Sequence, residues 1–195
     1  MENERQQELD AELRYSAARG RLPRVQELLE LGSSAKASGS DGATALMMAL
    51  SVCSVQAKAI VELLMPISDL NAVDVNGWSA ISWAAHWNDE SSMTTIKSML
   101  EMGARPRADK NGVTDLMRAS VQPRPDLARA LLPFSNAKDK DGNGRTARDH
   151  AKMACRAEAE EALAQAEQAI DASEERRALE RAVGVAPKSA RGLRM

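Results

Sequence analysis

Acidic residues and asparagine alternate in one short segment, as they do in loops that bind calcium. Asp139, Asp141 and Asn143 place side-chain oxygens at every second position. A calcium loop of this kind also needs a bidentate glutamate at its twelfth position. Counting from Asp139, His150 stands at that position and Ala147 at the ninth. Because half of the ligands are missing, we favour a structural turn over a calcium site.

Histidine and cysteine, the other residues able to bind metals or attack substrates, are few. The two histidines, His86 and His150, have none of the Cys or His neighbours that a zinc site requires. Cys53 and Cys155 also lack a histidine at a suggestive spacing, although a catalytic triad can be assembled from distant residues. We therefore predict inert or partly buried thiols, a packed or half-buried His150, no catalytic residue, no metal and no cofactor.

The tryptophans are bunched. Trp78, Trp83 and Trp87 lie within ten residues of a chain that has only two further aromatic side chains, one Tyr and one Phe. Exposed tryptophans are typical of interface anchors, whereas buried ones stabilise cores. Spacing alone leaves both interpretations open.

A short motif recurs four times and must position these residues. Its aligned glycines follow one another at spacings of 35, 35 and 32 residues: Gly42, Gly77, Gly112 and Gly144. Each is followed after two residues by Thr or Ser, and then by a helical stretch with one small residue at a fixed place: Ala49, Ala84, Ala119 and Ala151. A second apolar stretch carries paired bulky residues: Leu63-Leu64, Met99-Leu100 and Leu131-Leu132. Self-similarity at this period indicates stacked repeats.

Each part of the motif has a physical reason. A turn glycine can adopt positive φ, where other residues are strained. The hydroxyl group two residues later can accept a hydrogen bond from a free backbone N–H and so begin a helix. Alanine lets neighbouring helices approach closely, and the bulky pairs fill the space between units. One unit cannot bury its apolar face alone, so stability comes from stacking.

The motif resembles the ankyrin repeat, a β-turn followed by two antiparallel helices, over about residues 12–165. An N-terminal unit lacks the turn but keeps the two helices, at 13–20 and 25–32. The resemblance implies an all-α ankyrin-repeat solenoid of about five stacked helix-turn-helix units with a C-terminal helical cap. We expect a lead-in at 1–11 and an ankyrin-repeat domain at 12–166, and then a helical extension at 167–184 and a mobile basic tail at 185–195. The expected units are 12–37, 38–72, 73–108, 109–138 and 139–166.

The chain departs from the family pattern in two ways. The proline usual after the capping hydroxyl is replaced by Ala45, Ala80, Asp115 and Ala147. Pro66 and Pro133 are expected to stop second helices early, where the family more often has glycine.

Near the C-terminus, residues 171–174 predict a new N-cap and a separate short helix from Glu174 that ends at Gly184. The helical extension is interpreted as a polar cap or, alternatively, as a partner-binding helix.

Composition limits the remaining classes of function. The chain has 195 residues and a formal net charge of −2, which excludes a nucleic-acid binder held by bulk positive charge. Hydrophobic residues make up 44%, enough for a packed core. The charged N-terminus is not a classical signal peptide, and no run approaches the ~18 apolar residues of a membrane span. With two distant cysteines, we expect a reducing compartment, a cytoplasmic location and a monomer.

The resemblance also implies a binding surface. In ankyrin repeats, the turn tips and the ends of the first helices line a concave surface that contacts partners. It would place seven residues there: Val75, Asn76, Trp78, His86, Trp87, Lys110 and Asn111. Arg145 stands in the repeat position of Trp78, and a core position would not accept Arg readily, so we expect Trp78 to be exposed and Trp83 to be buried. For Trp87 both interpretations stay open.

The implied function is recognition of an unidentified partner protein without catalysis. An alternative is an inhibitor or regulator of an enzyme, for example a protein kinase. Residues 17–50 show a short resemblance to ankyrin-type inhibitors of cyclin-dependent kinases, whose first unit also runs Ala-Ala-Arg-Gly-Arg.

Overall fold

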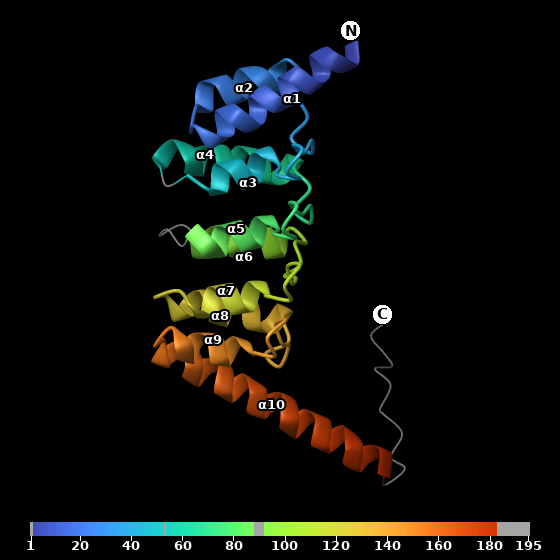
Figure 1. Ribbon diagram of the computed structural model, residues 1–195, viewed down its shortest axis with the longest axis vertical. Helices are drawn as coiled ribbons and strands as arrows, with labels where there is room; N and C mark the ends of the chain where they lie inside the picture. The colour runs from blue at the N-terminus through green and yellow to red at the C-terminus, as the bar shows by residue number, and fades with distance from the viewer. Residues whose placement is uncertain (1, 53, 88–91, 183–195) are drawn as a thin grey trace, which may run out of the picture.

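The computed structural model describes residues 2–52, 54–87 and 92–182, and in this part of the chain it is an all-α solenoid, as predicted. Helices lie in stacked pairs, with the turns between pairs along one edge (Figure 1). No strand occurs among the described residues, only isolated β-bridges within two turns. The pairs are α1 (Glu2–Ala18) with α2 (Leu22–Glu30), α3 (Ala45–Leu50) with α4 (Val55–Leu64), α5 (Ala80–Trp87) with α6 (Ser92–Glu101), α7 (Asp115–Ser120) with α8 (Pro125–Leu131), and α9 (Ala147–Met153) with α10 (Ala157–Ala182).

Glycine in the turns serves both conformation and contact. Gly42, Gly77 and Gly112 have φ values of 75°, 84° and 74°, in the left-handed region. A Cβ atom added to Gly42 would lie 2.9 Å from the Cα atom of Asp74 in the next turn. The corresponding distances from Gly77 and Gly112 to the next turn are 3.1 and 3.2 Å. Any side chain at these positions would therefore strain its own backbone and push the next repeat away.

Successive turns are joined by backbone hydrogen bonds, which we call the turn ladder. The N–H of Val75 donates to the carbonyl oxygen of Asp41 at 2.8 Å. The N–H of Lys110 donates to the backbone carbonyl oxygen of Asn76 at 3.1 Å, and that of Gly142 donates to the backbone carbonyl oxygen of Asn111 at 2.7 Å. The three bonds recur at the same place in each pair of turns, so the turns form one continuous edge.

Hydroxyl groups begin the first helices, as the motif predicts. Thr44, Thr114 and Thr146 accept hydrogen bonds from backbone N–H groups three residues on, at 3.4, 3.2 and 3.4 Å. Ser79 accepts one from the N–H of Ser82 at 3.3 Å. These helices pack in a row in the order α1, α3, α5, α7 and α9. The four fixed alanines are all buried in that row, within one hydrophobic core that runs from Leu13 to Leu163.

Second helices end in two ways. α2 and α6 are followed by Gly32 and Gly103 at φ values of 93° and 95°. α4 and α8 instead run into 3₁₀ turns, η1 (Met65–Ile67) and η2 (Leu132–Phe134), each with its proline in the middle. A proline cannot continue the α-helical hydrogen-bond pattern, so it ends these two helices early.

The chain ends were predicted less well. α1 already begins at Glu2, so the expected lead-in belongs to the first helix. The separate helix from Glu174 is wrong, because α10 continues from Ala157 to Ala182 without a break. Asp171 does not cap a new helix: its carboxylate pairs with Lys138, and the backbone on both sides of it belongs to α10. The expected end at Gly184 and the tail at 185–195 lie outside the described residues.

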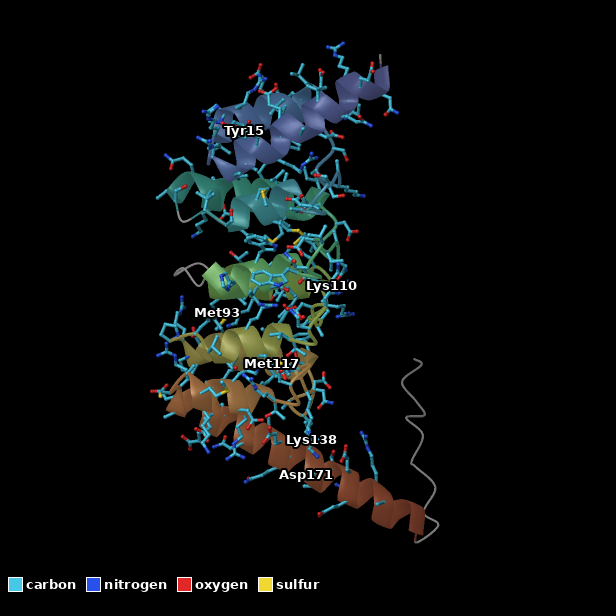
Figure 2. The ribbon with its side chains drawn as sticks, in the orientation of Figure 1. Tyr15, Met93, Lys110, Met117, Lys138 and Asp171 are labelled. Carbon is cyan, nitrogen blue, oxygen red and sulfur yellow. The ribbon has the colours of Figure 1, made fainter. Side chains whose placement is uncertain are left out.

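The first half of α10 packs against α9 and α8 and so closes the stack. Ala159 and Leu163 are buried against the core, and Ile170 is partly buried. Further along, Lys138 pairs with Asp171 (Figure 2), but residues 171–178 are exposed. Figure 1 shows the second half of α10 extending obliquely beyond the stack. Capping therefore rests on the first half of the helix.

Cys155 is exposed rather than partly buried, which corrects the expectation for this thiol. It has a φ of 55°, and among the described residues it is the only non-glycine at positive φ. Its N–H donates to Lys152 at 3.0 Å, and the next N–H donates to Ala151 at 2.9 Å, a helix ending that glycine usually adopts.

We predict that Leu163→Ala lowers the free energy of unfolding by about 2–5 kcal/mol, because it leaves a cavity where α10 packs against the core. Urea unfolding followed by circular dichroism measures the change. Glu175→Ala, on the exposed half of the same helix, is the matched control and should stay within about 0.5 kcal/mol of the unchanged chain. Equal stability of the two variants would contradict the capping role.

We predict that Cys155→Gly raises the free energy of unfolding by up to about 1 kcal/mol, because glycine tolerates the left-handed backbone. Cys155→Ala removes the thiol but keeps the strain, so it should not stabilise. Thermal unfolding of both variants under reducing conditions checks this, and stabilisation by alanine as large as that by glycine would show that the backbone is not the cause.

Candidate functional site

An open hollow lies where the turns of the third and fourth repeats meet, and we call it the turn hollow. Its volume is about 510 Å³. Four of the seven predicted binding residues line it: Asn76, Trp78, Lys110 and Asn111. Asp109, Val113 and Arg118 complete the lining. Figure 2 shows Lys110 at the edge formed by the turns.

Trp78 is half-buried and lies at the centre of an aromatic and cationic cluster. Its ring meets those of Trp83 and His86 edge to face, with centroids 5.4 and 5.0 Å away. The guanidinium carbon of Arg118 lies 3.9 Å from its ring centroid, a cation–π contact. The expected contrast between an exposed Trp78 and a buried Trp83 is therefore wrong, because both are half-buried. An arginine from the next repeat covers Trp78, and the indole N–H of Trp83 is used as a donor.

That donor serves a carboxylate that organises the turn. The Oδ1 atom of Asp74 accepts the backbone N–H groups of Asn76 and Trp78 at 2.8 and 2.9 Å. Its Oδ2 atom accepts the indole N–H of Trp83 at 3.3 Å. One carboxylate thus ties the turn, including the backbone of Trp78, to the first helix.

Asp109 repeats this arrangement with a charged partner. Its Oδ1 atom accepts the N–H groups of Asn111 and Val113 at 2.8 and 2.9 Å, and its Oδ2 atom pairs with Arg118. The two side chains are only 5% and 12% exposed. Removing one partner from a pair this buried leaves an uncompensated charge, so Arg118 is held firmly over Trp78.

In the last turn the same arrangement involves Asp141, one of the candidate calcium ligands, and His150, which stands where a calcium loop needs glutamate. Asp141 accepts the N–H groups of Asn143 and Arg145, and its Oδ2 atom lies 2.9 Å from Nε2 of the half-buried His150. The backbone N–H of Arg145 is the main cause that lowers the pKa of Asp141, with His150 a smaller one. Both carboxylate oxygens are thus engaged within the repeat.

The other three predicted binding residues, Val75, His86 and Trp87, are not among those that line the turn hollow. Val75 is 48% exposed at the turn tip. His86 is exposed as a whole, but its ring packs against Trp78 and is partly shielded from water. This desolvation lowers the pKa of His86, and the positive charge of Arg118 lowers it further. Trp87 is the last residue of α5, and its side chain lies outside the described part of the structure.

Sequence reasoning missed Arg118, Asp109 and Val113 as lining residues. Arg118 aligns with Met48, Trp83 and His150, so this repeat position is highly variable. That variability was the available signal, because a position packed the same way in every repeat would keep one kind of side chain.

A second missed feature is Asp115, which is fully buried between the third and fourth repeats. It begins α7 in the place where the family has proline. Its carboxylate accepts hydrogen bonds from the hydroxyl of Ser82 in α5 and from the backbone N–H of Arg107 at 3.0 Å. Burial raises the pKa of Asp115, although these hydrogen bonds and Arg118 act in the opposite direction.

Comparison with known proteins agrees with the repeat geometry. Residues 13–108 match the family model of ankyrin repeats (3 copies). The last two helix pairs lie outside this match but keep the turn glycine, the capping threonine and the turn carboxylate. A search of curated proteins finds no match. Within the described residues, no helix has both the length and the apolar character needed to cross a membrane.

We predict a pH-dependent effect of Asp115→Asn. The unfolded chain ionises this carboxyl near pH ~3.9, whereas the folded chain resists ionisation, so the folded state loses stability as the pH rises above about 4. Asparagine cannot ionise. The free energy of unfolding of Asp115→Asn, taken relative to that of the unchanged chain, should therefore increase from about pH 4 towards neutral pH. Urea unfolding of both proteins across this range tests it. His86 also changes its charge within this range, but it is present in both proteins, so its contribution cancels in the difference between their free energies of unfolding. If that difference does not vary with pH, the buried charge at Asp115 is contradicted.

Proposed function

Since this chain is an ankyrin-repeat protein, we propose that it binds a partner protein through the concave surface around the turn hollow and performs no catalysis. Ankyrin repeats are generally protein–protein interaction modules, and the family is typically non-catalytic. Stacking fixes side chains from separate repeats on one frame, which is how such proteins build extended binding surfaces. A cytoplasmic location is part of the same proposal.

One observation supports this proposal most strongly: the turn hollow presents a half-buried tryptophan on rigid backbone. The backbone N–H of Trp78 is bonded to Asp74, and its ring is packed against Trp83, His86 and Arg118. A tryptophan that is already ordered loses little conformational entropy when a partner covers its remaining surface. Trp and Arg are also the residue types most enriched among binding hot spots.

We predict that Trp78→Ala weakens binding of the partner by at least about tenfold, because truncation of an anchor costs ~2 kcal/mol or more in binding free energy. Since the ring is half-buried, the same change should also lower the free energy of unfolding by about 1–2 kcal/mol. The partner is first captured from a cell lysate by the intact chain and identified by mass spectrometry. Its affinity is then measured for the intact and variant chains by calorimetry.

Phe134→Ala is the matched control, because Phe134 is 48% exposed in η2 and does not line the turn hollow. It should leave the affinity unchanged. Circular dichroism shows whether each variant is folded at the temperature of the assay. If folded Trp78→Ala binds the captured protein as tightly as the Phe134→Ala control, the proposed surface is wrong.

A further inference from the structure

The polar groups of the turn hollow differ in whether they already have partners. The ammonium of Lys110 and the side-chain amides of Asn76 and Asn111 take part in no hydrogen bond or ion pair within the described structure. The acid of the hollow, Asp109, is 5% exposed, and both of its oxygens are engaged. The hollow therefore offers free hydrogen-bond donors and one free positive charge, but no free carboxylate.

Two arginines belong to the fourth and fifth repeats, but only the second adds accessible positive charge to the turns. Arg118 sits over Trp78, with one of its nitrogens paired to Asp109. Two repeats beyond Trp78, at the matching position, Arg145 is partly exposed, whereas its neighbour Asp141 is buried and bound to His150. Lys110 and Arg145 are thus accessible in the turns of the fourth and fifth repeats, whereas Asp109 and Asp141, which organise these turns, are hidden; the exposed Asp139 adds one negative charge to the fifth turn.

The second repeat differs at its turn. Asp41 is exposed there, although its Oδ1 atom accepts the N–H of Ala43 at 3.0 Å. Exposed Asp41 therefore lies on one side of Trp78 along the turns, and exposed Lys110 lies on the other. This arrangement gives a bound segment a preferred direction, because its negative charge is attracted to Lys110 and repelled by Asp41.

We infer that the turn hollow binds an acidic peptide segment of the partner protein. A carboxylate of the segment accepts hydrogen bonds from Lys110 and from the amides of Asn76 and Asn111, and a neighbouring apolar side chain covers Trp78. Hydrogen bonds to a charged group are stronger than neutral ones, and the indole supplies apolar area beside them. This inference rests on the proposed function and adds the chemistry of the partner.

Selection from a library of short random peptides, displayed on phage and presented to the intact chain, tests the inference. The peptides that are enriched are then synthesised and serve as the probes. We expect them to carry net negative charge together with an apolar residue. Replacing their Asp and Glu with Asn and Gln should weaken binding by about tenfold or more.

Charge reversal on the protein supplies the second arm. Lys110→Glu should weaken binding of the acidic probes by about tenfold or more, and this loss of affinity should become smaller as salt is added. Lys58→Glu is the matched control, because Lys58 is an exposed lysine on α4 and does not line the hollow. It should change the affinity by less than about twofold.

The outcomes separate the inference from the proposed function. Suppose that the probes lose affinity for Trp78→Ala but are neutral or basic, or bind Lys110→Glu as tightly as the unchanged chain. The inference of an acidic partner is then wrong, while the proposed binding surface is supported. If the probes bind Trp78→Ala as tightly as the unchanged chain, or if the selection enriches no peptide, both the proposed binding surface and the inference are contradicted.

Discussion

The close approach of successive turns is the constraint on which the rest of the structure depends. At Gly42, Gly77 and Gly112 the backbone is left-handed, and the next turn lies where a side chain would begin. Gly144 has a similar φ of 78°, but a Cβ there would meet nothing within 4 Å. The contrast separates two roles of glycine: the conformation is needed in every turn, and the missing side chain is needed only where another turn follows. That spacing permits the turn ladder, and the ladder holds the turn hollow together.

Buried carboxylates then determine which charges the surface displays. Asp74, Asp109 and Asp141 each bind their own turn with one oxygen and the first helix with the other, although the helix donor is an indole, a guanidinium or an imidazole. In the second repeat Gly39 takes the aligned position, and Asp41 binds the turn from two residues further on. The variable donors differ in charge and shape, so the same scaffold yields a different surface in each repeat. At the fourth repeat the result is an arginine fixed over a tryptophan.

Local chemistry explains how much of this could be predicted from sequence. Turn glycines, capping hydroxyls, small helix residues and the helix ends at Pro66 and Pro133 each follow from one residue and its near neighbours. The burial of Trp78 does not, because the group that covers it, Arg118, is contributed by the next repeat. Asp171 illustrates a different failure, since an aspartate can cap a new helix or pair with a lysine outside a continuous one, and the local sequence does not distinguish the two. Four residues of the turn hollow were predicted from the family resemblance, and its charged pair was not.

Hydrogen exchange of the turn amides tests the central claim most directly, namely that the turns form one rigid, hydrogen-bonded edge. The amide protons of Val75, Lys110 and Gly142 belong to exposed turns that would exchange rapidly if each repeat stood alone. NMR-detected exchange in the intact chain should instead show all three protected, because each donates to the turn before it. Exchange of these protons at the rate of an unstructured peptide would contradict the turn ladder and, with it, a preformed binding surface.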